Sequence, residues 1–407
     1  MKSNGSILSI QRLSRLENFG HSLSGPAYLY RPTHPEQIAD LFKHATKQGV
    51  TVGLRGAGRS YGDASLNSGQ VVLDFQRMNR ILSWDRESGL VKLEPGVTIE
   101  QIWNYTLEDG WWPPVVPGTM FPTIAGCLGS NVHGKNNWNA GTLGEHVLEC
   151  EILMPTGKIF TCSPTKEKEL FYAAIGGIGM LGVFTSITLQ MKKIYSGDLN
   201  VFAWTEPNLQ QSLNAIDQEK ENDYVVGWID STSSGKGLGR SQLHTANYFA
   251  EGEDAAPAQS LKTEHQSLPD TIVGLLPKSM VWRLMRPWMN NLGVRLGNNG
   301  KYMFSRTLGN QKHFQQSIAA FNFLLDYVPN WERSYGQGGL IQYQSFIPTP
   351  NSHDVFAEMI RLSKKRHLPS YLGVVKRHRT DKFLLSHGVD GFSLALDFQV
   401  TRNNRGR

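Results

Sequence analysis

The sequence is short of the features that mark secreted, disulfide-stabilised and zinc-binding proteins. Its 407 residues include only three cysteines, Cys127, Cys150 and Cys162, which are odd in number and widely spaced. That pattern fits a reducing cytosol better than a disulfide framework or a zinc site. Residues 1–16 are polar and lack the apolar core of a signal peptide. We therefore expect a cytoplasmic protein without a bound metal.

Long apolar runs and clustered charge are also missing. The most apolar segment, 173–184, is too short to span a membrane and carries four glycines. The net charge is +6, but the basic residues are scattered and match no recognisable nucleic-acid module. This mild positive charge favours anionic small-molecule ligands over nucleic acid. The length allows a large core, and we expect two domains.

A glycine-rich loop follows a short apolar run at residues 50–54, which predicts a buried strand. Gly56, Gly58 and Gly62 let the backbone approach a ligand closely, because no Cβ intervenes. Consecutive N–H groups in such a turn form a concave site for phosphate oxygens. The glycine spacing is one residue longer than the nicotinamide-dinucleotide fingerprint, and a polar loop follows in place of a helix. The segment therefore predicts a phosphate loop between strands, with an ordinary glycine-rich turn as the alternative.

A second candidate surface follows a stiff, proline-containing stretch at residues 111–119. Small residues recur between 123 and 134, where a flat, bulky ligand can lie against the backbone. His133 and Lys135 stand beside this surface. An isolated histidine is more often structural, but the adjacent lysine and the phosphate loop favour a functional role. A second glycine cluster follows at residues 176–182.

The predicted secondary structure indicates an α+β protein. Helices are expected at residues 35–49 and 98–109, and strands at 50–54, 71–74 and 90–94. These short strands do not alternate regularly with helices. Past residue 197 the pattern changes to longer helices and alternating strands, so we place one domain at residues 1–195 and another at 196–407.

Three segments of the second domain carry particular expectations. Residues 252–269 are polar and aperiodic, which predicts a mobile loop. Residues 276–296 predict one basic amphipathic helix, whose apolar face either touches a membrane surface or, as we favour, packs on the domain. Gln342 and Gln344 share one face of a predicted strand at residues 340–347, suited to binding sugar hydroxyls.

Four motifs taken together resemble FAD-binding oxidases of the vanillyl-alcohol oxidase/PCMH class, and among these the decaprenylphosphoryl-ribose oxidase family. They are R-G-x-G-R-S-Y-G-D, P-G-T, H-G-K-N and E-L-F-x-A-x-x-G-G-x-G-x-x-G. The likeness covers about residues 25–400. It implies a two-domain PCMH-type FAD-binding fold with a C-terminal antiparallel-sheet substrate domain.

The resemblance also implies which residues line FAD and how the cofactor is held. The implied FAD-lining residues are Arg55, Gly56, Ala57, Gly58, Arg59, Ser60, Tyr61, Gly62, Pro117, Gly118, Thr119, Thr123, Ala125, Gly126, Gly129, Ser130, Asn131, His133, Gly134, Gly179, Gly182 and Val183. Related sugar and aldonolactone oxidases often have a histidine, covalently bonded to the flavin, at the place of Arg59. Arginine cannot form that bond, so the resemblance predicts non-covalent FAD.

The implied reaction transfers a hydride from a carbinol carbon to FAD N5. The expected hydroxyl-facing residues are Tyr61, His133 and Lys135, and the expected substrate-binding residues are Trp228, Gln342, Gln344 and Lys376. Neutral His133 is a candidate base, and Lys376 is placed to bind a phosphate. The implied substrate is a sugar or sugar phosphate, ribose-like and lipid-linked. A separate NAD(P)-dependent reductase is an expected partner, in a cell-wall pathway by resemblance.

Two departures from the family pattern leave alternatives open. Ser393 and Ala395 stand where the family has a pocket asparagine and often a cysteine. Family members continue past the last strand with a segment that supplies another active-site lysine, which has no counterpart before Arg407. The alternatives are an aldonolactone or alditol oxidase that uses oxygen, and a flavin-binding protein with little turnover.

Overall fold

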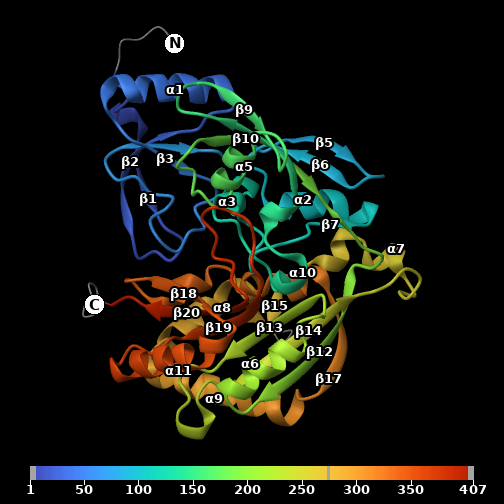
Figure 1. Ribbon diagram of the computed structural model, residues 1–407. Coiled ribbons are helices and arrows are strands. Elements are labelled where there is room, and N and C mark those ends of the chain that lie inside the picture. Colours follow the sequence, from blue (N-terminus) through green and yellow to red (C-terminus); the bar gives the residue numbers. More distant parts are fainter. Residues whose placement is uncertain (1–5, 273–275, 402–407) are drawn as a thin grey trace.

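The computed structural model describes residues 6–272 and 276–401 (Figure 1). In Figure 1 the N-terminal part of the chain forms the upper half of the molecule, and a large sheet with its helices forms the lower half. The expected mixture of helices and sheets, with an antiparallel sheet in the C-terminal part, is confirmed. The sequence ending at Arg407, on which one departure rests, lies outside the described residues.

The first sheet of the upper half has the strand order β1-β2-β4-β3. Its elements are β1 (Leu13–Glu17), β2 (Ser24–Tyr30), β3 (Val52–Arg55) and β4 (Val71–Asp74), with α1 (Pro35–Gln48) between β2 and β3. Strand β4 is parallel to both β2 and β3, and its four residues are buried. Ile38, Phe42 and Ala45 of α1 pack against this sheet. Because β3 pairs with the buried strand β4, the start of the glycine loop that follows β3 is held in place.

The second sheet of the upper half is antiparallel, with the order β5-β6-β10-β8-β9. Its strands are β5 (Ile81–Asp85), β6 (Leu90–Leu93), β8 (Val147–Leu153), β9 (Ile159–Cys162) and β10 (Val183–Gln190). The surrounding elements are α2 (Ile99–Thr106), β7 (Trp111–Trp112), α3 (Ile124–Gly129), α4 (Asn137–Ala140), α5 (Lys168–Ala174) and β11 (Lys192–Lys193). Thr98 and Gln101 form a capping box that starts α2.

All three cysteines are buried and unpaired.

A seven-stranded antiparallel sheet forms the lower half, in the order β17-β12-β14-β13-β19-β20-β18. Its strands are β12 (Asp198–Glu206), β13 (Tyr224–Ile229), β14 (Ser241–Tyr248), β17 (Lys312–Ser317), β18 (Leu340–Pro348), β19 (Leu372–His378) and β20 (Gly391–Gln399). Helices α6 (Leu209–Gln218) and α11 (Thr349–Lys365) cover one face around Ile216, Val375 and Phe356. The other face of this sheet is not covered by α6 and α11.

Most of residues 252–269, where we predict a mobile loop, lack regular secondary structure, but several side chains of the segment are buried. This segment contains α7 (Pro257–Ser260), and both Ser260 and Gln266 are buried. The Asp254 carboxylate accepts hydrogen bonds from the hydroxyls of Ser196 at 2.5 Å and Ser260 at 2.6 Å. Polar side chains can hold a segment in place when they bond to one another, and such partners cannot be recognised from polarity along the chain.

The predicted single helix at residues 276–296 is wrong. The chain forms a short hairpin of β15 (Thr271–Ile272) and β16 (Leu276–Pro277), and then α8 (Lys278–Met285). A short 3-10 helix (Arg286–Trp288) and the extended residue Asn290 separate α8 from α9 (Asn291–Leu308), and α10 (Ile318–Asn322) follows β17. Pro287 has no N–H to donate, and the Asn290 side chain caps α9. Among the described residues, no helix is long and apolar enough to cross a bilayer.

Candidate functional site

The glycine loop presents unused hydrogen-bond donors at the end of β3. Among the hydrogen bonds of the described residues, none is donated by a backbone N–H of residues 56–62. A Cβ at Gly56 would lie 2.1 Å from Thr123 Oγ1, so the loop backbone rests directly on the start of α3. Gly58 has φ +67°, a conformation that strains other residues. A row of free N–H groups on a tightly packed turn suits the oxygens of a pyrophosphate.

The two arginines of the loop have different surroundings. Arg55 donates to Ser65 at 3.1 Å and to the carbonyl of Glu17 at 3.0 Å, so its guanidinium fixes the loop to β1. The Arg59 guanidinium lies 5.3 Å from the ring centre of Phe19 and 4.8 Å from that of Phe121. Arg59 is thus held by cation–π contacts, which leave its N–H groups available to a ligand.

Three glycine-rich segments, far apart in sequence, meet around the loop. A Cβ at Gly179 would lie 2.6 Å from Leu54, and one at Gly129 would lie 3.9 Å from the Ile178 backbone. Asn131 is fully buried, and its Nδ2 has no hydrogen-bond partner. Glycine surfaces beside free donors fit a flat, anionic cofactor, and a buried unpaired amide is a donor that such a ligand can satisfy. The residues present therefore fit FAD.

The P-G-T segment connects this region to the lower half. Asp326 accepts from Thr119 Oγ1 at 2.7 Å and from the Met120 N–H at 2.8 Å. Burial raises the pKa of Asp326 to about 6. Gly118 faces Leu325 across ordinary contact distance, while Gly182 and Val183 lie at the start of β10 against Leu153 of β8. The upper half is thereby joined to the lower half next to the glycine loop.

All four predicted substrate-binding residues lie on the same face of the seven-stranded sheet. The strand register aligns Gln344 with Ala395, Val374 and Trp228 in turn. It also aligns Lys376 with Ser393, and Gln342 with Asp397. We call this the polar face, defined by Trp228, Gln342, Gln344, Lys376, His378, Ser393 and Asp397. It is the face opposite to α6 and α11, because alternate residues of a strand point to opposite sides.

His133 meets the polar face through Gln344. Gln344 Nε2 lies 3.2 Å from His133 Nε2 and 3.0 Å from Ser393 Oγ. His378 Nε2 is 2.7 Å from the same hydroxyl. The His133 ring is also 4.6 Å from that of His378 and 5.2 Å from that of His387. The predicted hydroxyl-facing histidine and one predicted sugar-binding glutamine are therefore in direct contact.

The three histidines of this cluster are held in the neutral form. Burial, and then the charge of Lys376, lowers the pKa of His133 well below its usual value. The same two causes lower the pKa of His378, and burial also lowers that of His387. One ring nitrogen of each histidine is buried without a hydrogen-bond partner. The cluster can consequently accept or pass a proton to a bound molecule.

Two lysines give the site an uncompensated positive character. Lys135 donates to the carbonyl of Phe321 and lies 4.6 Å from its ring centre. Burial, and then the charge of Lys376, lowers the pKa of Lys135 to about 7. Burial lowers the pKa of Lys376 to about 8, and no carboxylate of the described residues forms an ion pair with Lys376 or Lys135. A buried cation without a counter-ion suits an anionic ligand.

Tyr61 lies at the other end of the site. It packs with Tyr335 and Leu340, and burial, followed by the charge of Asp397, raises the pKa of Tyr61 well above its usual value. Gln342 Nε2 donates to Asp397 at 2.7 Å, and burial raises the pKa of Asp397 to about 7. Neither a hydrogen bond nor a ring contact joins Tyr61 to His133 or Lys135 among the described residues. Tyr61 and His133 therefore bracket the polar face.

Sequence reasoning missed His378, His387, Asp397 and the role of Ser393. His378 lies two residues after Lys376 on β19, so strand alternation alone could have placed both on one face. His387 lies in the connection between β19 and β20, and this connection extends into the upper half of the molecule in Figure 1. No local pattern marks it. Trp228 is buried on the polar face, and its ring centre lies 4.2 Å from Nζ of Lys301 on α9.

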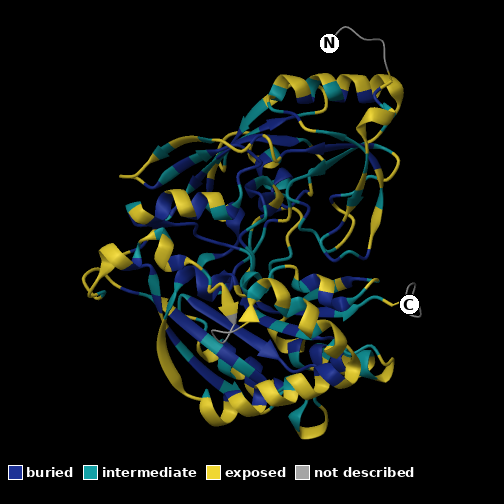
Figure 2. Ribbon diagram, turned by 180° about the vertical axis from the view of Figure 1, so that it is seen from behind, coloured by how far each residue is buried: buried dark blue, intermediate teal, exposed yellow. Residues whose placement is uncertain are grey.

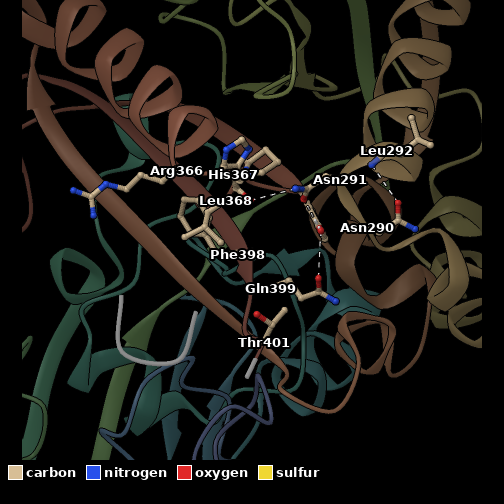
Figure 3. Close-up of a pocket in the computed structure, with 11 residues that line it drawn as sticks. Asn290, Asn291, Leu292, Arg366, His367, Leu368, Phe398, Gln399 and Thr401 are labelled. Atoms are coloured by element: carbon tan, nitrogen blue, oxygen red, sulfur yellow. Dashed lines mark hydrogen bonds between the residues drawn. The ribbon is translucent and has the colours of Figure 1, made fainter. Parts of the chain in front are cut away.

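A separate pocket of about 510 Å³ lies between the start of α9 and the end of β20 (Figure 3). It is lined by Asn290, Asn291, Leu292, Arg366, His367, Leu368, Pro369, Tyr371, Phe398, Gln399 and Thr401. In Figure 3 Arg366 and His367 lie on the side opposite to Asn290 and Leu292. None of the predicted site residues lines this pocket.

Comparison with known proteins agrees with this geometry. A family described as an FAD binding domain matches residues 26–163. Decaprenylphosphoryl-beta-D-ribose oxidase of Mycolicibacterium smegmatis is 28% identical over 393 residues, covering 95% of this chain and 83% of that protein. A putative D-arabinono-1,4-lactone oxidase of Neurospora crassa is 27% identical over 185 residues, or 46% and 30% of the two chains. D-lactate dehydrogenase of Anaerostipes hadrus is 29% identical, over 41% and 36%.

The fold and site define an FAD-dependent oxidoreductase that acts on CH–OH donors. The chain has a PCMH-type FAD-binding domain, and its similarity to a decaprenylphosphoryl-ribose oxidase extends over nearly its whole length. The family resemblance drawn from the four motifs is confirmed, as is FAD as the cofactor.

Proposed function

We propose that this enzyme oxidises a secondary hydroxyl of a phosphorylated, ribose-like sugar. The observation that supports the proposal most is the pair Lys135 and Lys376, two buried cations that share the site with Gln342 and Gln344 and lack carboxylate partners. Phosphate would supply the missing negative charge, and the glutamines would bind sugar hydroxyls. The name of the mycolicibacterial relative supports a lipid-linked form of such a sugar.

In this proposal residues 1–195 hold FAD and residues 196–407 hold the substrate. The free N–H groups of residues 56–62 would bind the pyrophosphate, and the glycine surfaces near Gly129 and Gly179 would lie against the cofactor. The other predicted FAD-lining residues keep that role as part of the proposal. Bound non-covalently, FAD would supply the acceptor for the hydride that leaves the carbinol carbon.

The chain's own residues would position the substrate and move one proton. Neutral His133 can take the hydroxyl proton as the C–H bond breaks, so that the carbon becomes a carbonyl. Gln344 contacts the imidazole and is itself held by Ser393, and Lys376 would fix the phosphate end. Trp228 would bound the polar face on the α9 side, with Tyr61 at the Asp397 side.

Anaerobic bleaching of the flavin band tests the proposal. A short-chain prenyl-phosphoryl ribose should bleach the enzyme, and the unphosphorylated sugar should need about tenfold or more higher concentration, because one charge-assisted contact contributes roughly 1.5–3 kcal/mol. Fastest bleaching by D-arabinono-1,4-lactone would instead favour the oxygen-using alternative, which the Neurospora relative suggests. Bound flavin that no sugar bleaches would indicate the alternative with little turnover.

A second, coupled assay tests whether a reductase acts on the oxidised product. If a separate NAD(P)-dependent reductase is the partner, adding one that reduces the keto sugar should convert the ribose-like substrate to its epimer. Absence of any epimer in a coupled assay, with bleaching intact, would restrict the function to oxidation alone.

A further inference from the structure

Helices α8 and α9 each carry large apolar side chains that are exposed to solvent. Met280, Leu284, Trp288, Leu292 and Leu296 follow one another at intervals of four residues, and Phe304 and Leu308 continue the series. We call these seven residues the α8–α9 face. Trp288 is 66% exposed, Leu292 68% and Phe304 64%. Figure 2 shows α9 as largely exposed along the lower edge of the molecule. Several large apolar side chains left exposed along one segment of the chain often mark an interaction surface.

The inner side of α9 already makes the contacts that hold the helix on the sheet. Val294 and Tyr302 are buried. Asn298 donates to Asp230 at 3.3 Å, and the Arg240 guanidinium lies 4.5 Å from the Tyr302 ring centre. The favoured expectation, that the apolar side chains of residues 276–296 pack on the domain, holds for Met289 and Val294, which pack near Tyr335, but not for the α8–α9 face. These side chains point away from the core they were expected to join.

Positive charge surrounds the α8–α9 face. Arg283, Arg286, Arg295 and Arg306 are exposed, and none of them forms an ion pair with another described residue. The sequence contains no aspartate or glutamate between residues 271 and 325. Arginines that alternate with leucine, methionine and tryptophan are typical of helices that lie in the interface of an anionic bilayer.

We propose that the α8–α9 face docks the enzyme on the surface of a bilayer containing anionic lipids. The apolar side chains of this face would enter the headgroup region, and the four arginines would meet the lipid phosphates. A second copy of the chain is a poorer occupant, because two identical faces would bring eight unpaired arginines together. Docking would bring the polar face within about one helix diameter, ~10 Å, of the lipid, since Lys301 of α9 contacts Trp228.

Vesicle co-sedimentation of the FAD-loaded enzyme tests this proposal without reference to any substrate. Vesicles of equimolar phosphatidylcholine and phosphatidylglycerol should sediment the protein, and phosphatidylcholine alone should bind it at least about tenfold more weakly. Arg283→Gln/Arg286→Gln should weaken binding to the anionic vesicles by about tenfold or more, because each basic side chain near the surface contributes roughly a factor of five. Trp288→Ser/Leu292→Ser should weaken it comparably.

Matched variants elsewhere on the surface serve as controls. Arg361→Gln/Lys365→Gln on α11 removes the same charge, and Ile10→Ser/Leu82→Ser removes two exposed apolar side chains from the upper half. Both should bind like the unmodified enzyme. The proposal is overturned by equal loss in the control variants, by equal binding to both lipid mixtures, or by no binding. It is also overturned by a dimer in light scattering that Trp288→Ser/Leu292→Ser abolishes.

Discussion

Gln344 Nε2 on β18 lies 3.2 Å from Nε2 of His133, which follows α3 in the upper half. This contact joins the FAD-binding part of the chain to the large sheet, at the point where both predicted sets of site residues meet. Because Gln344 also contacts Ser393, it fixes the histidine relative to the sheet. The orientation of the candidate base thus depends on a residue more than two hundred positions away in sequence.

Gln344→Ala should lower kcat/KM by about tenfold, because a hydrogen bond in such a site contributes roughly 0.5–1.5 kcal/mol and the imidazole loses its support. Tyr343→Ala is the matched control, since its exposed side chain leaves β18 on the opposite side. Equal activity of Gln344→Ala and the unmodified enzyme, with the fold intact by circular dichroism, would exclude Gln344 from the site.

Lys376→Met should stabilise the substrate-free protein near pH 7 while abolishing the preference for phosphorylated substrate. The pKa of Lys376 falls from 10.5 to about 8 on folding, because burial disfavours the charge. Between these values the unfolded chain binds more protons, so this group makes stability rise as pH rises through that range. The gain from Lys376→Met, about 3 kcal/mol at about pH 7 because the pKa falls by about 2.5, should therefore be mostly lost by about pH 10.

Thermal melting of both proteins across this pH range measures the effect. Lys365→Met on α11 provides a control at an exposed lysine. A stability difference that stays constant with pH would mean that Lys376 keeps its ordinary pKa in the folded protein and has a counter-ion.

Gly56→Ala should release FAD, with affinity at least about tenfold lower. The new Cβ would meet Thr123 Oγ1 at 2.1 Å, and relief of that clash would shift the loop whose N–H groups we propose for the pyrophosphate. Gly300→Ala, where no atom lies within 4 Å of the added Cβ, is the control and should retain flavin. The ratio of flavin to protein absorbance after gel filtration gives the result. Full flavin content in Gly56→Ala would place the phosphates elsewhere.

Acid precipitation should release all the flavin into the supernatant. The resemblance that predicts this outcome rests on Arg59, whose guanidinium is stacked between Phe19 and Phe121 and cannot form the covalent bond that a histidine forms. Denatured protein that stays yellow after washing would contradict the prediction. Peptide mapping of the yellow fraction would then identify the residue that carries the flavin.

The local elements and the class of protein followed from short stretches of sequence. The expected helices at 35–49 and 98–109 match α1 and α2 with its following turn, because capping residues and apolar spacing act within a few positions. The strand containing Gln342 and Gln344 and their common face also followed from alternation. The four motifs sufficed for FAD because together they resemble a known FAD-binding class, whereas the glycine loop alone predicted only a phosphate site or an ordinary turn.

Other features were decided only when distant segments packed together. The segment around Asp254 and Gln266 has the sequence of a polar loop. Its buried contacts depend on partners outside the segment, Ser196 for Asp254 and the Gly197 carbonyl for Gln266. The contact of His133 with Gln344, His378 and His387 needs the strand order of the large sheet and the path of the β19–β20 connection. The sequence determined most of the local elements and, through the resemblance, the cofactor, but not the break between α8 and α9. Tertiary structure decided which side chains share the site and which apolar residues stay exposed, because burial depends on neighbours that the local sequence does not specify.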